Sequence, residues 1–484
     1  MKPTLLFILG FLTSLLFPPY FFVPLGFLIF PSICLLIDNN RIILKRKTIF
    51  LYSFTYGFGF LLSLLIWMQN PFYIFEETKN LFYFSFLFIF FLAILFAVNF
   101  LIIITFFKKI PAFILVPIIF ISFEFILSRL FSGFPWVTFA LIISSFSETI
   151  IITKYFGSFV TSFLLIFIFC LPYVLINKIL KKFEYTIILI IVFVPLFAFI
   201  INAVYNYENE DRIKKNLNLE IIQLNNKIND FENNQNKLDI IEDLITNSDA
   251  EIIVFAENNY PFLLKDISFN RIQKILGDHQ TVIIGATRQE KEKYYNSLIN
   301  INNKNISYYD KKILVPFGEF LPFREKLKFL EKISGPNDYS EGQKKRLISI
   351  SKDINYIPII CYEIIFYWKI INKLNYQSDF IINITNDFWF GRHIGPYQHF
   401  YLTKMRSSEF NKIIIRVSNN GISGIFDSNA NILIKTSLNK KEIIRETISI
   451  NENNINYFQL HLFSNIILLF LIITIIVFYR FQHE

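Results

Sequence analysis

The stretch YIPIICYEII, residues 356–365, joins a short apolar run to a more polar segment through a single cysteine. The isoleucine-rich residues before Cys361 are typical of a buried β-strand, and the residues after it favour a helix. A cysteine at such a junction faces a helix N-terminus, which lowers the pKa of a thiol. The stretch therefore predicts an α/β domain in which Cys361 is a candidate nucleophile.

Other segments of the same polar block also have strand-like and helix-like patterns. Further β-branched apolar runs lie at residues 219–223, 251–255, 281–285 and 380–384, and residues 237–245 place apolar side chains on one helical face. These patterns predict a layered α/β domain. Open α/β sheets place their chemistry at the carboxyl ends of strands, so Glu257, just after its strand, and Lys311, before the apolar residues 313–315, are further candidates.

Outside this block the chain is strongly apolar. Of its 484 residues 54% are hydrophobic and 60 are Phe, which excludes an ordinary soluble protein. We expect a membrane domain at 1–204 with seven spans, a catalytic domain at 205–455 and a last span within 456–484. A spanning helix needs about 20 apolar residues. Runs near this length lie at 3–19, 21–37, 49–69, 81–106, 111–128, 153–177, 184–203 and 460–479.

Basic residues predict the orientation of these spans. They gather in alternate loops, at residues 41–47, 108–109 and 178–182. The positive-inside rule places these loops and both chain ends in the cytoplasm, so residues 205–455 lie outside, in the periplasm of a bacterium. The first apolar run lacks a small-residue cleavage site and is expected to stay as a span. Because the loops account for the net charge of +9, no nucleic-acid partner is predicted.

The three candidate residues together suit acyl transfer. A thiolate attacks a carbonyl carbon, a carboxylate such as Glu257 can take the thiol proton, and the Lys311 ammonium can stabilise the developing oxyanion. Each residue also has a plainer interpretation: a free Cys ending a strand commonly fills a core, and loop Glu and Lys are commonly solvated charges.

The surrounding motifs distinguish these interpretations. Residues 255–258 (FAEN), 309–323 (YDKKILVPFGEFLPF) and 360–363 (ICYE) resemble the glutamate, lysine and cysteine motifs of the nitrilase superfamily, in the same order. Residues 133–136 (GFPW), 385–391 (TNDFWFG) and 416–421 (RVSNNG) resemble motifs of its membrane-bound branch, the apolipoprotein N-acyltransferases. The resemblance covers nearly the whole chain. It implies an α-β-β-α sandwich attached to a polytopic helical membrane domain of about eight spans.

This resemblance implies a ping-pong reaction. Cys361 would take the sn-1 acyl chain of a phospholipid as a thioester, and the amine of a diacylglyceryl-cysteine apolipoprotein would attack it, with Glu257 as proton acceptor and Lys311 stabilising the oxyanion. Under this hypothesis the protein is a monomer, and the membrane lipids around it are further partners. Supporting residues would be Glu319, Tyr362 and Glu363, and substrate-lining residues Gly133, Trp136, Gln223, Asn225 and Trp389.

The residues alone also allow other functions. A membrane-tethered amidase or nitrilase would use the same three residues on a small carbon-nitrogen substrate, and a transporter or sensor would need ionisable residues in its spans. Trp136 could equally be an aromatic anchor at the membrane interface. His393 and His399 are six positions apart, which does not suit a metal pair on one helix face, so neither metal nor cofactor is predicted.

Overall fold

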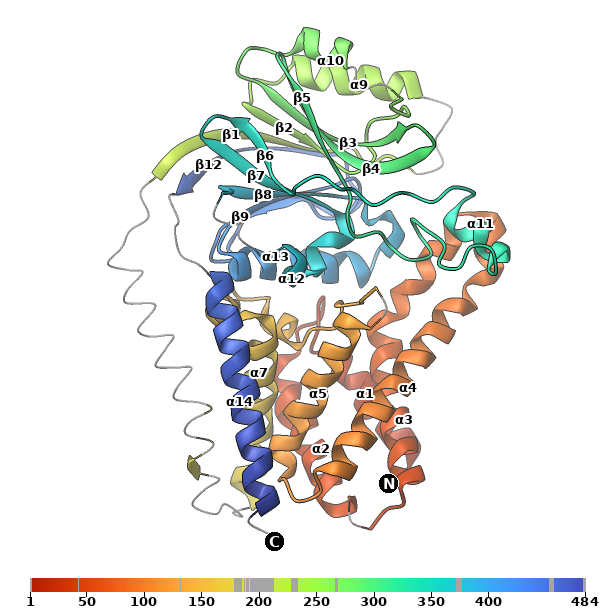
Figure 1. Ribbon diagram of the computed structural model, residues 1–484, viewed down its shortest axis with the longest axis vertical. Helices are drawn as coiled ribbons and strands as arrows, with labels where there is room; N and C mark the ends of the chain where they lie inside the picture. Colours follow the sequence, from red (N-terminus) through yellow and green to blue (C-terminus); the bar gives the residue numbers. More distant parts are fainter. Residues whose placement is uncertain are drawn as a thin grey trace. The chain divides into compact units, whose positions relative to one another are not determined.

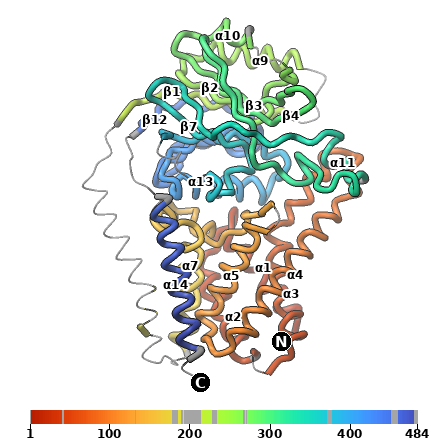
Figure 2. Tube along the Cα trace, viewed as in Figure 1, coloured from red at the N-terminus to blue at the C-terminus, as the bar shows by residue number. Residues whose placement is uncertain are grey.

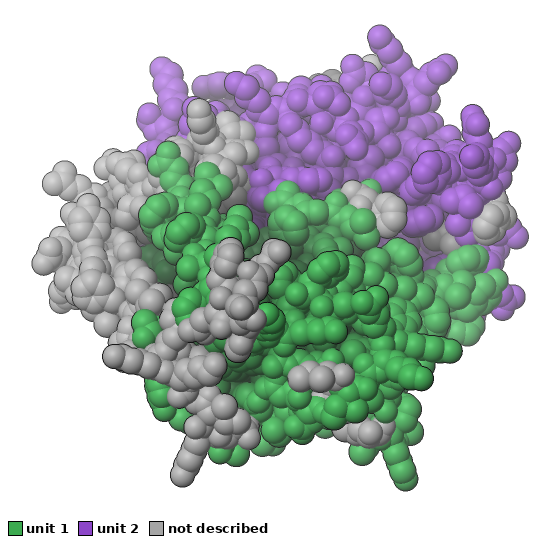
Figure 3. All heavy atoms as spheres, turned by 60° about the horizontal axis from the view of Figure 1, so that its bottom comes forward, with its two compact units in different colours: residues 1–69, 82–210, 456–484 green, residues 70–81, 211–455 purple. Residues whose placement is uncertain are grey.

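The chain divides into two compact units. The computed structural model describes residues 2–41, 43–130, 132–177, 185–186, 188, 191, 213–227, 234–265, 269–370, 377–451 and 457–481. The first unit comprises residues 1–69, 82–210 and 456–484, and the second comprises residues 70–81 and 211–455 (Figure 3). The second unit is therefore built from two separate pieces of the chain.

The first unit is helical in its described part. Five of its segments are long and apolar enough to cross a membrane, namely Arg46–Tyr73, Glu76–Phe106, Ala112–Arg129, Ile152–Ile176 and Gln459–Tyr479. They coincide with predicted spans. The long helices, labelled in Figure 1, are α1 (Pro3–Ser14), α2 (Gly26–Asn40), α3 (Arg46–Leu65), α4 (Tyr83–Phe106), α5 (Ala112–Arg129), α7 (Ile152–Asn177) and α14 (Tyr457–Phe481).

The first two helices differ from the prediction. Helices α1 and α2 contain 12 and 15 residues, which is short of the apolar runs predicted at 3–19 and 21–37. Pro18, Pro19 and Pro24 lie between them, where a missing amide hydrogen and a fixed φ interrupt helical hydrogen bonding. The span predicted at 184–203 falls largely outside the described residues.

The second unit contains two six-stranded sheets. The first has the order β12-β1-β2-β3-β4-β5, with bounds Ile213–Gln223 (β1), Ile252–Phe255 (β2), Thr281–Glu290 (β3), Lys293–Asn302 (β4), Ile306–Asp310 (β5) and Glu442–Asn451 (β12). The second has the order β11-β10-β9-β8-β7-β6, with bounds Ile348–Ser351 (β6), Ile354–Ile360 (β7), Phe380–Thr385 (β8), Ile413–Ser418 (β9), Gly424–Phe426 (β10) and Ile432–Lys435 (β11).

Helices cover the outer face of each sheet. Helices α9 (Asn234–Thr246) and α10 (Asn270–Ile275) lie over the first sheet, where Ile241 and Ile272 pack against Phe255 and Val282. Helix α13 (Gly395–Phe410) lies along the second sheet, and the two sheets face each other between the helices (Figures 1 and 2). The predicted α-β-β-α sandwich is confirmed.

Strand register brings the candidate residues to one edge. Strands β7, β8 and β9 are parallel, and Ile360 pairs with Ile384, so Cys361 and Thr385 are neighbours just beyond the paired ends. Glu257 follows β2 in the other sheet. Lys311 directly follows β5, and the apolar residues 313–315 after it lie outside the strands.

A short segment from the membrane part of the sequence belongs to the second unit. Residues 70–81 connect helices α3 and α4 but pack within the second unit. Asn70 Nδ2 donates to the Phe390 carbonyl oxygen at 3.0 Å, and a side chain at Gly391, whose φ is 78°, would collide with Asn70. The glycine therefore permits both the left-handed backbone and the close approach of Asn70.

Candidate active site

Four polar residues form a buried cluster between the sheets. Lys311 Nζ lies 2.9 Å from Glu319 Oε1 and 3.7 Å from Glu257 Oε1. Asn296 on β4 donates from Nδ2 to both carboxylates, at 2.8 Å in each case. Since Lys311 is 1% exposed and Glu257 is 5% exposed, these charges interact with little screening by water.

The cluster shifts the proton affinities of its members. Burial raises the pKa of Glu257, and the negative charge of Glu319 adds to this, although the Lys311 ammonium opposes it. Burial alone would lower the pKa of Lys311, but Glu319, Glu257 and Cys361 raise it, so the ammonium stays charged. A buried carboxylate with a raised pKa next to a fixed cation is suited to accept a proton and return it.

Cys361 occupies a strained position beside this cluster. Its side chain is nearly buried and its φ of 50° lies in the left-handed region, which is unusual for a residue other than glycine. The charges of both Glu257 and Lys311 act on its thiol. Such strain persists only where the surroundings enforce it, and it is common at functional sites.

The structure corrects one expectation about this thiol. The segment after Cys361 is a 3₁₀ helix of five residues, Cys361–Ile365, and not a long α-helix with a substantial dipole. Burial raises the pKa of the thiol, Glu257 raises it further, and Lys311 lowers it only in part. Cys361 is therefore a thiol at rest, and its chemistry needs a base such as Glu257.

Glu363 connects the cysteine turn to the lysine loop. Its Oε1 accepts hydrogen bonds at 2.9 Å from Tyr309, Arg346 and the Lys312 amide, and its Oε2 accepts from the Ile360 amide at 2.9 Å. Burial alone would raise the pKa of Glu363, but Arg346 and the backbone donors lower it. Glu363 is thus a buried anion that fixes the backbone on both sides of the site.

Two of the predicted substrate-lining residues make internal hydrogen bonds. Gln223, fully buried at the end of β1, donates to the Ser437 carbonyl at 2.8 Å and accepts from the Thr436 hydroxyl at 2.8 Å. Asn225 has a left-handed backbone and donates to the Asn439 carbonyl at 3.0 Å. These bonds hold the segment after β1 against the segment before β12.

The remaining predicted residues lie in different surroundings. Tyr362 is nearly buried and packs against Phe366, and Trp389 is 36% exposed in the 3₁₀ helix Asp387–Phe390. Gly133 and Trp136 belong to the first unit, where the Trp136 ring lies 4.6 Å from that of Trp67. The structure therefore brings together Glu257, Lys311, Glu319, Cys361 and Glu363, and it places Gly133 and Trp136 in the other unit.

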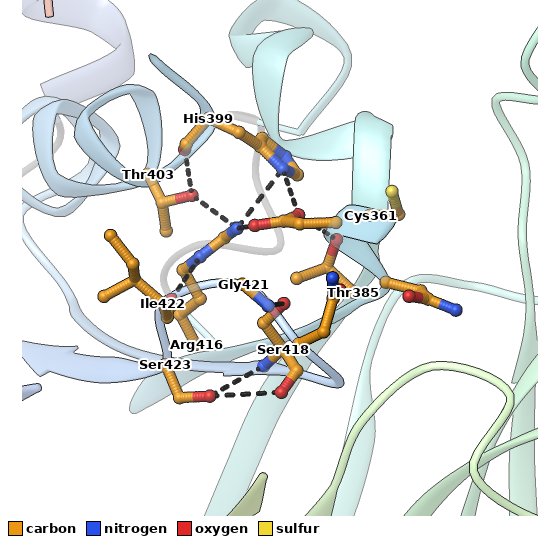
Figure 4. A network of polar contacts seen from close by, with 12 residues as sticks. Cys361, Thr385, His399, Thr403, Arg416, Ser418, Gly421, Ile422 and Ser423 are labelled. Carbon is orange, nitrogen blue, oxygen red and sulfur yellow. Dashed lines mark hydrogen bonds and ion pairs between the residues drawn. The ribbon is translucent and has the colours of Figure 1, made fainter. Parts of the chain in front are cut away.

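A second polar network, absent from the predicted site, lies behind Cys361 (Figure 4). Asp387 Oδ2 lies 2.5 Å from Arg416 Nη2, and Asp387 Oδ1 lies 2.9 Å from His399 Nδ1, with all three side chains fully buried. Burial alone would raise the pKa of Asp387, but Arg416 and His399 lower it to about 2. Burial and Arg416 lower the pKa of His399, and Asp387 opposes this only in part.

The sequence contained only part of the signal for this network. Asp387 and Arg416 lie in the motifs TNDFWFG and RVSNNG. His399 ends residues 395–399 (GPYQH), which also fit the resemblance, but its distance along the chain from Arg416 gives no sign of contact. Asn296, which joins the two carboxylates of the cluster, lies in residues 295–298 (YNSL), which fit the resemblance, but the alternating polar residues around it do not indicate a buried strand.

Two family models match the chain. Residues 9–171 match the apolipoprotein N-acyltransferase N-terminal domain, and residues 219–453 match the carbon-nitrogen hydrolase domain. Together these ranges include most of the first unit and nearly all of the second.

Curated relatives match in two ways. An apolipoprotein N-acyltransferase from Rhizobium rhizogenes is 35% identical over 212 residues, which is 41% of this chain and 40% of that protein. The chain thus matches well under two thirds of that relative's length. One from Rickettsia typhi is 28% identical over 471 residues, 91% of each chain. A solved carbon-nitrogen hydrolase superfamily protein from Xanthomonas campestris is 14% identical, covers 49% of this chain and 91% of its own, and has a TM-score of 0.39.

Proposed function

Because the chain belongs to the apolipoprotein N-acyltransferase family, we propose that it transfers a fatty acyl chain from the sn-1 position of a phospholipid to the amine of a diacylglyceryl-cysteine apolipoprotein. The observation that carries this proposal is the cluster of Glu257, Lys311, Glu319 and Asn296, in which the charges of Glu257 and Lys311 act on the thiol of Cys361. A nucleophile, a proton acceptor and a fixed cation in one water-poor site are the groups that acyl transfer requires.

The first half of the reaction acylates the enzyme. Glu257 takes the proton of the Cys361 thiol as the sulfur attacks the acyl carbonyl carbon. The Lys311 ammonium, held by Glu319, stabilises the negative charge that forms on the carbonyl oxygen. Glu257 then gives the proton to the departing glycerol oxygen, which leaves a thioester on Cys361 and releases a lysophospholipid.

The second half transfers the acyl chain to the acceptor. The neutral amine of the diacylglyceryl-cysteine attacks the thioester carbonyl, and Glu257 accepts a proton from the nitrogen. The carbon-sulfur bond breaks, and the Cys361 sulfur regains a proton. The product is an N-acylated apolipoprotein. The proposal includes no cofactor, since the acyl group passes from an ester through the thioester to an amide without another reagent.

The membrane supplies both substrates in this proposal. The apolar helices of the first unit support an integral membrane protein, and the basic loops support a multi-pass arrangement in the bacterial inner membrane with both ends in the cytoplasm and the catalytic unit in the periplasm. We propose a monomer whose partners are the phospholipid donor, the apolipoprotein acceptor and surrounding lipids.

Mass spectrometry of the protein purified from membranes tests this proposal. The parent is incubated with phospholipid and no acceptor, next to Cys361→Ala and, as a matched control, Cys170→Ala, which removes another buried free thiol. We expect a hydroxylamine-sensitive fatty-acyl adduct on the parent and on Cys170→Ala, and none on Cys361→Ala.

Two outcomes count against it. If the parent forms no adduct with phospholipid, lipid thioester chemistry is excluded, and hydrolysis of small amides or nitriles by the same residues becomes the better hypothesis. If the adduct forms but water discharges it as fast as an added diacylglyceryl peptide does, the protein is a lipid hydrolase.

A further inference from the structure

The end of β8 places a hydroxyl group next to the proposed nucleophile. Since Ile360 on β7 pairs with Ile384 on β8, the next residues, Cys361 and Thr385, lie opposite each other. Thr385 is fully buried, and its Oγ1 donates to Asp387 Oδ1 at 3.1 Å. The Thr385 side chain also lowers the pKa of the Cys361 thiol, although burial raises that pKa overall. Figure 4 shows Cys361 next to the polar network that contains Thr385.

The surrounding charges make an ionised Cys361 costly. Glu257, at the end of β2, and Asp387, after β8, both disfavour negative charge on the sulfur, whereas Lys311, after β5, favours it. His399 on α13 has a pKa lowered by burial and by Arg416, so it adds no positive charge near neutral pH. A thiolate here therefore needs a hydrogen-bond donor close to the sulfur.

Thr385 has one hydrogen to donate and two lone pairs to accept. With Cys361 as a thiol, the S–H can donate to Thr385 Oγ1 while the Thr385 hydroxyl donates to Asp387. Asp387 does not depend on that bond, because Arg416 and His399 also contact its two oxygens. The hydroxyl is thus free to change its acceptor at small cost to Asp387.

We propose that Thr385 is a catalytic group whose hydroxyl turns from Asp387 to the Cys361 sulfur when the thiol is deprotonated. The thiol proton passes to a Glu257 oxygen, the electron pair stays on sulfur, and the Thr385 proton stays on Oγ1. The same turn stabilises the sulfur again when it leaves the thioester. This inference rests on the proposed function, in which Cys361 is the nucleophile.

Alkylation of Cys361 by iodoacetamide tests the role of the hydroxyl without any acyl donor. The rate is measured on the intact protein in detergent at mildly alkaline pH, by mass spectrometry of the Cys361 peptide. Thr385→Val removes the hydroxyl at nearly constant volume, and Thr385→Ser keeps it. Thr403→Val is the matched control, because Thr403 is equally buried in the same network and bonds to the His399 carbonyl and to Arg416.

We expect Thr385→Val to be alkylated about 10- to 100-fold more slowly than the parent, the range for losing a hydrogen bond to a charged group. Thr385→Ser and Thr403→Val should react at close to the parental rate. The inference is overturned if Thr385→Val reacts at the parental rate, if Thr385→Ser is as slow as Thr385→Val, or if Thr403→Val is equally slow. Thr385→Ala replaces Thr385→Val if the valine variant does not fold.

The outcome separates the two proposals. A slow Thr385→Val variant in a protein that forms no acyl adduct would support the hydroxyl role and reject acyl transfer from phospholipid. An acyl adduct in the parent together with unchanged alkylation of Thr385→Val would do the reverse.

Discussion

Glu257 lowers the stability of the folded protein at neutral pH, although the proposed reaction needs its carboxylate. Its pKa is raised in the folded protein, so ionisation costs more in the folded state than in the unfolded state. The folded state therefore loses stability as the pH rises from the ordinary carboxyl value through the raised one. At neutral pH the ionised Glu257 therefore lowers the stability of the folded state, and other interactions in the fold offset this loss.

Replacing this carboxylate should separate activity from stability. We expect Glu257→Gln to slow acylation of Cys361 by about 10²- to 10⁴-fold, because the proton acceptor is lost. At neutral pH the variant should unfold about 1–3 °C higher than the parent, and the gain should vanish in acid. Acylation rates and thermal unfolding in detergent measure both. Glu251→Gln, which changes a partly exposed carboxylate paired with Lys215, should do neither.

Asp387 has the opposite dependence on pH. Its pKa falls from the usual 3.8 to about 2 in the folded protein, so its ionised form adds stability above the usual value. That contribution, about 2 kcal/mol, is lost as the pH falls from about 4 toward about 2. Asp387→Asn should therefore be less stable at neutral pH and should lose less stability over this acid range.

Thermal unfolding at a series of pH values measures this difference. Asp353→Asn is the control, because Asp353 is exposed in the turn between β6 and β7. An acid dependence in Asp387→Asn as steep as that of the parent would show that the Arg416 and His399 contacts do not hold the charge of Asp387.

At the scale of elements, one ion pair joins two loops of the site. Arg346, 5% exposed, lies 2.9 Å from Glu363, which bonds to backbone amides beside both Lys311 and Cys361. Arg346→Met would leave Glu363 as a buried anion without its cation. We expect a loss of about 3–5 kcal/mol in the free energy of unfolding, and slower acylation as the two loops separate.

A second substitution distinguishes charge from packing in this pair. Glu363→Gln combined with Arg346→Met should recover part of the lost stability, since no unpaired charge then remains. Lys345→Met, at the exposed neighbouring position, serves as the control. If the double variant is no more stable than Arg346→Met, the cost comes from lost packing of the arginine side chain.

The strands differ in how well the sequence predicted them. Runs of β-branched residues marked parts of β1, β2, β3, β7 and β8, because both faces of these strands are apolar and buried. Strand β4 was missed because Asn296 and Asn300 interrupt its apolar residues. Asn296 Nδ2 donates to Glu257 and Asn300 Oδ1 accepts from the Tyr356 hydroxyl at 3.3 Å, and such pairing depends on strands distant in the sequence.

The candidate site was predictable only in part, because some of its contacts also depend on elements distant in the sequence. Motifs gave Glu257, Lys311 and Cys361 in order, and strand ends gave a reason for them to meet. The state of the thiol was not predictable, because burial of Cys361 and the short turn after it follow from packing. Thr385 and His399 required the register of β7 and β8 and the position of α13.

At the scale of the whole molecule, the basic loops predict which parts of the chain face each side of the membrane. Lys45 and Asn429 are exposed positions, one in the loop after α2 and one between β10 and β11. We expect Asn429→Cys to react with a membrane-impermeant thiol reagent in intact spheroplasts, and Lys45→Cys to react only after the membrane is permeabilised. The parent, with three buried cysteines, gives the background. The reverse pattern would invert the proposed topology.

The catalytic unit cannot be excised from this protein as one continuous piece. Its boundaries cross the chain at 69/70, 81/82, 210/211 and 455/456, so a fragment of residues 211–455 lacks the segment that supplies Asn70 to the Phe390 carbonyl. Such a truncation would expose the backbone beside Gly391, directly after the segment that contains Asp387. A fragment that keeps the second unit intact therefore has to include residues 70–81, joined to residues 211–455 through a linker.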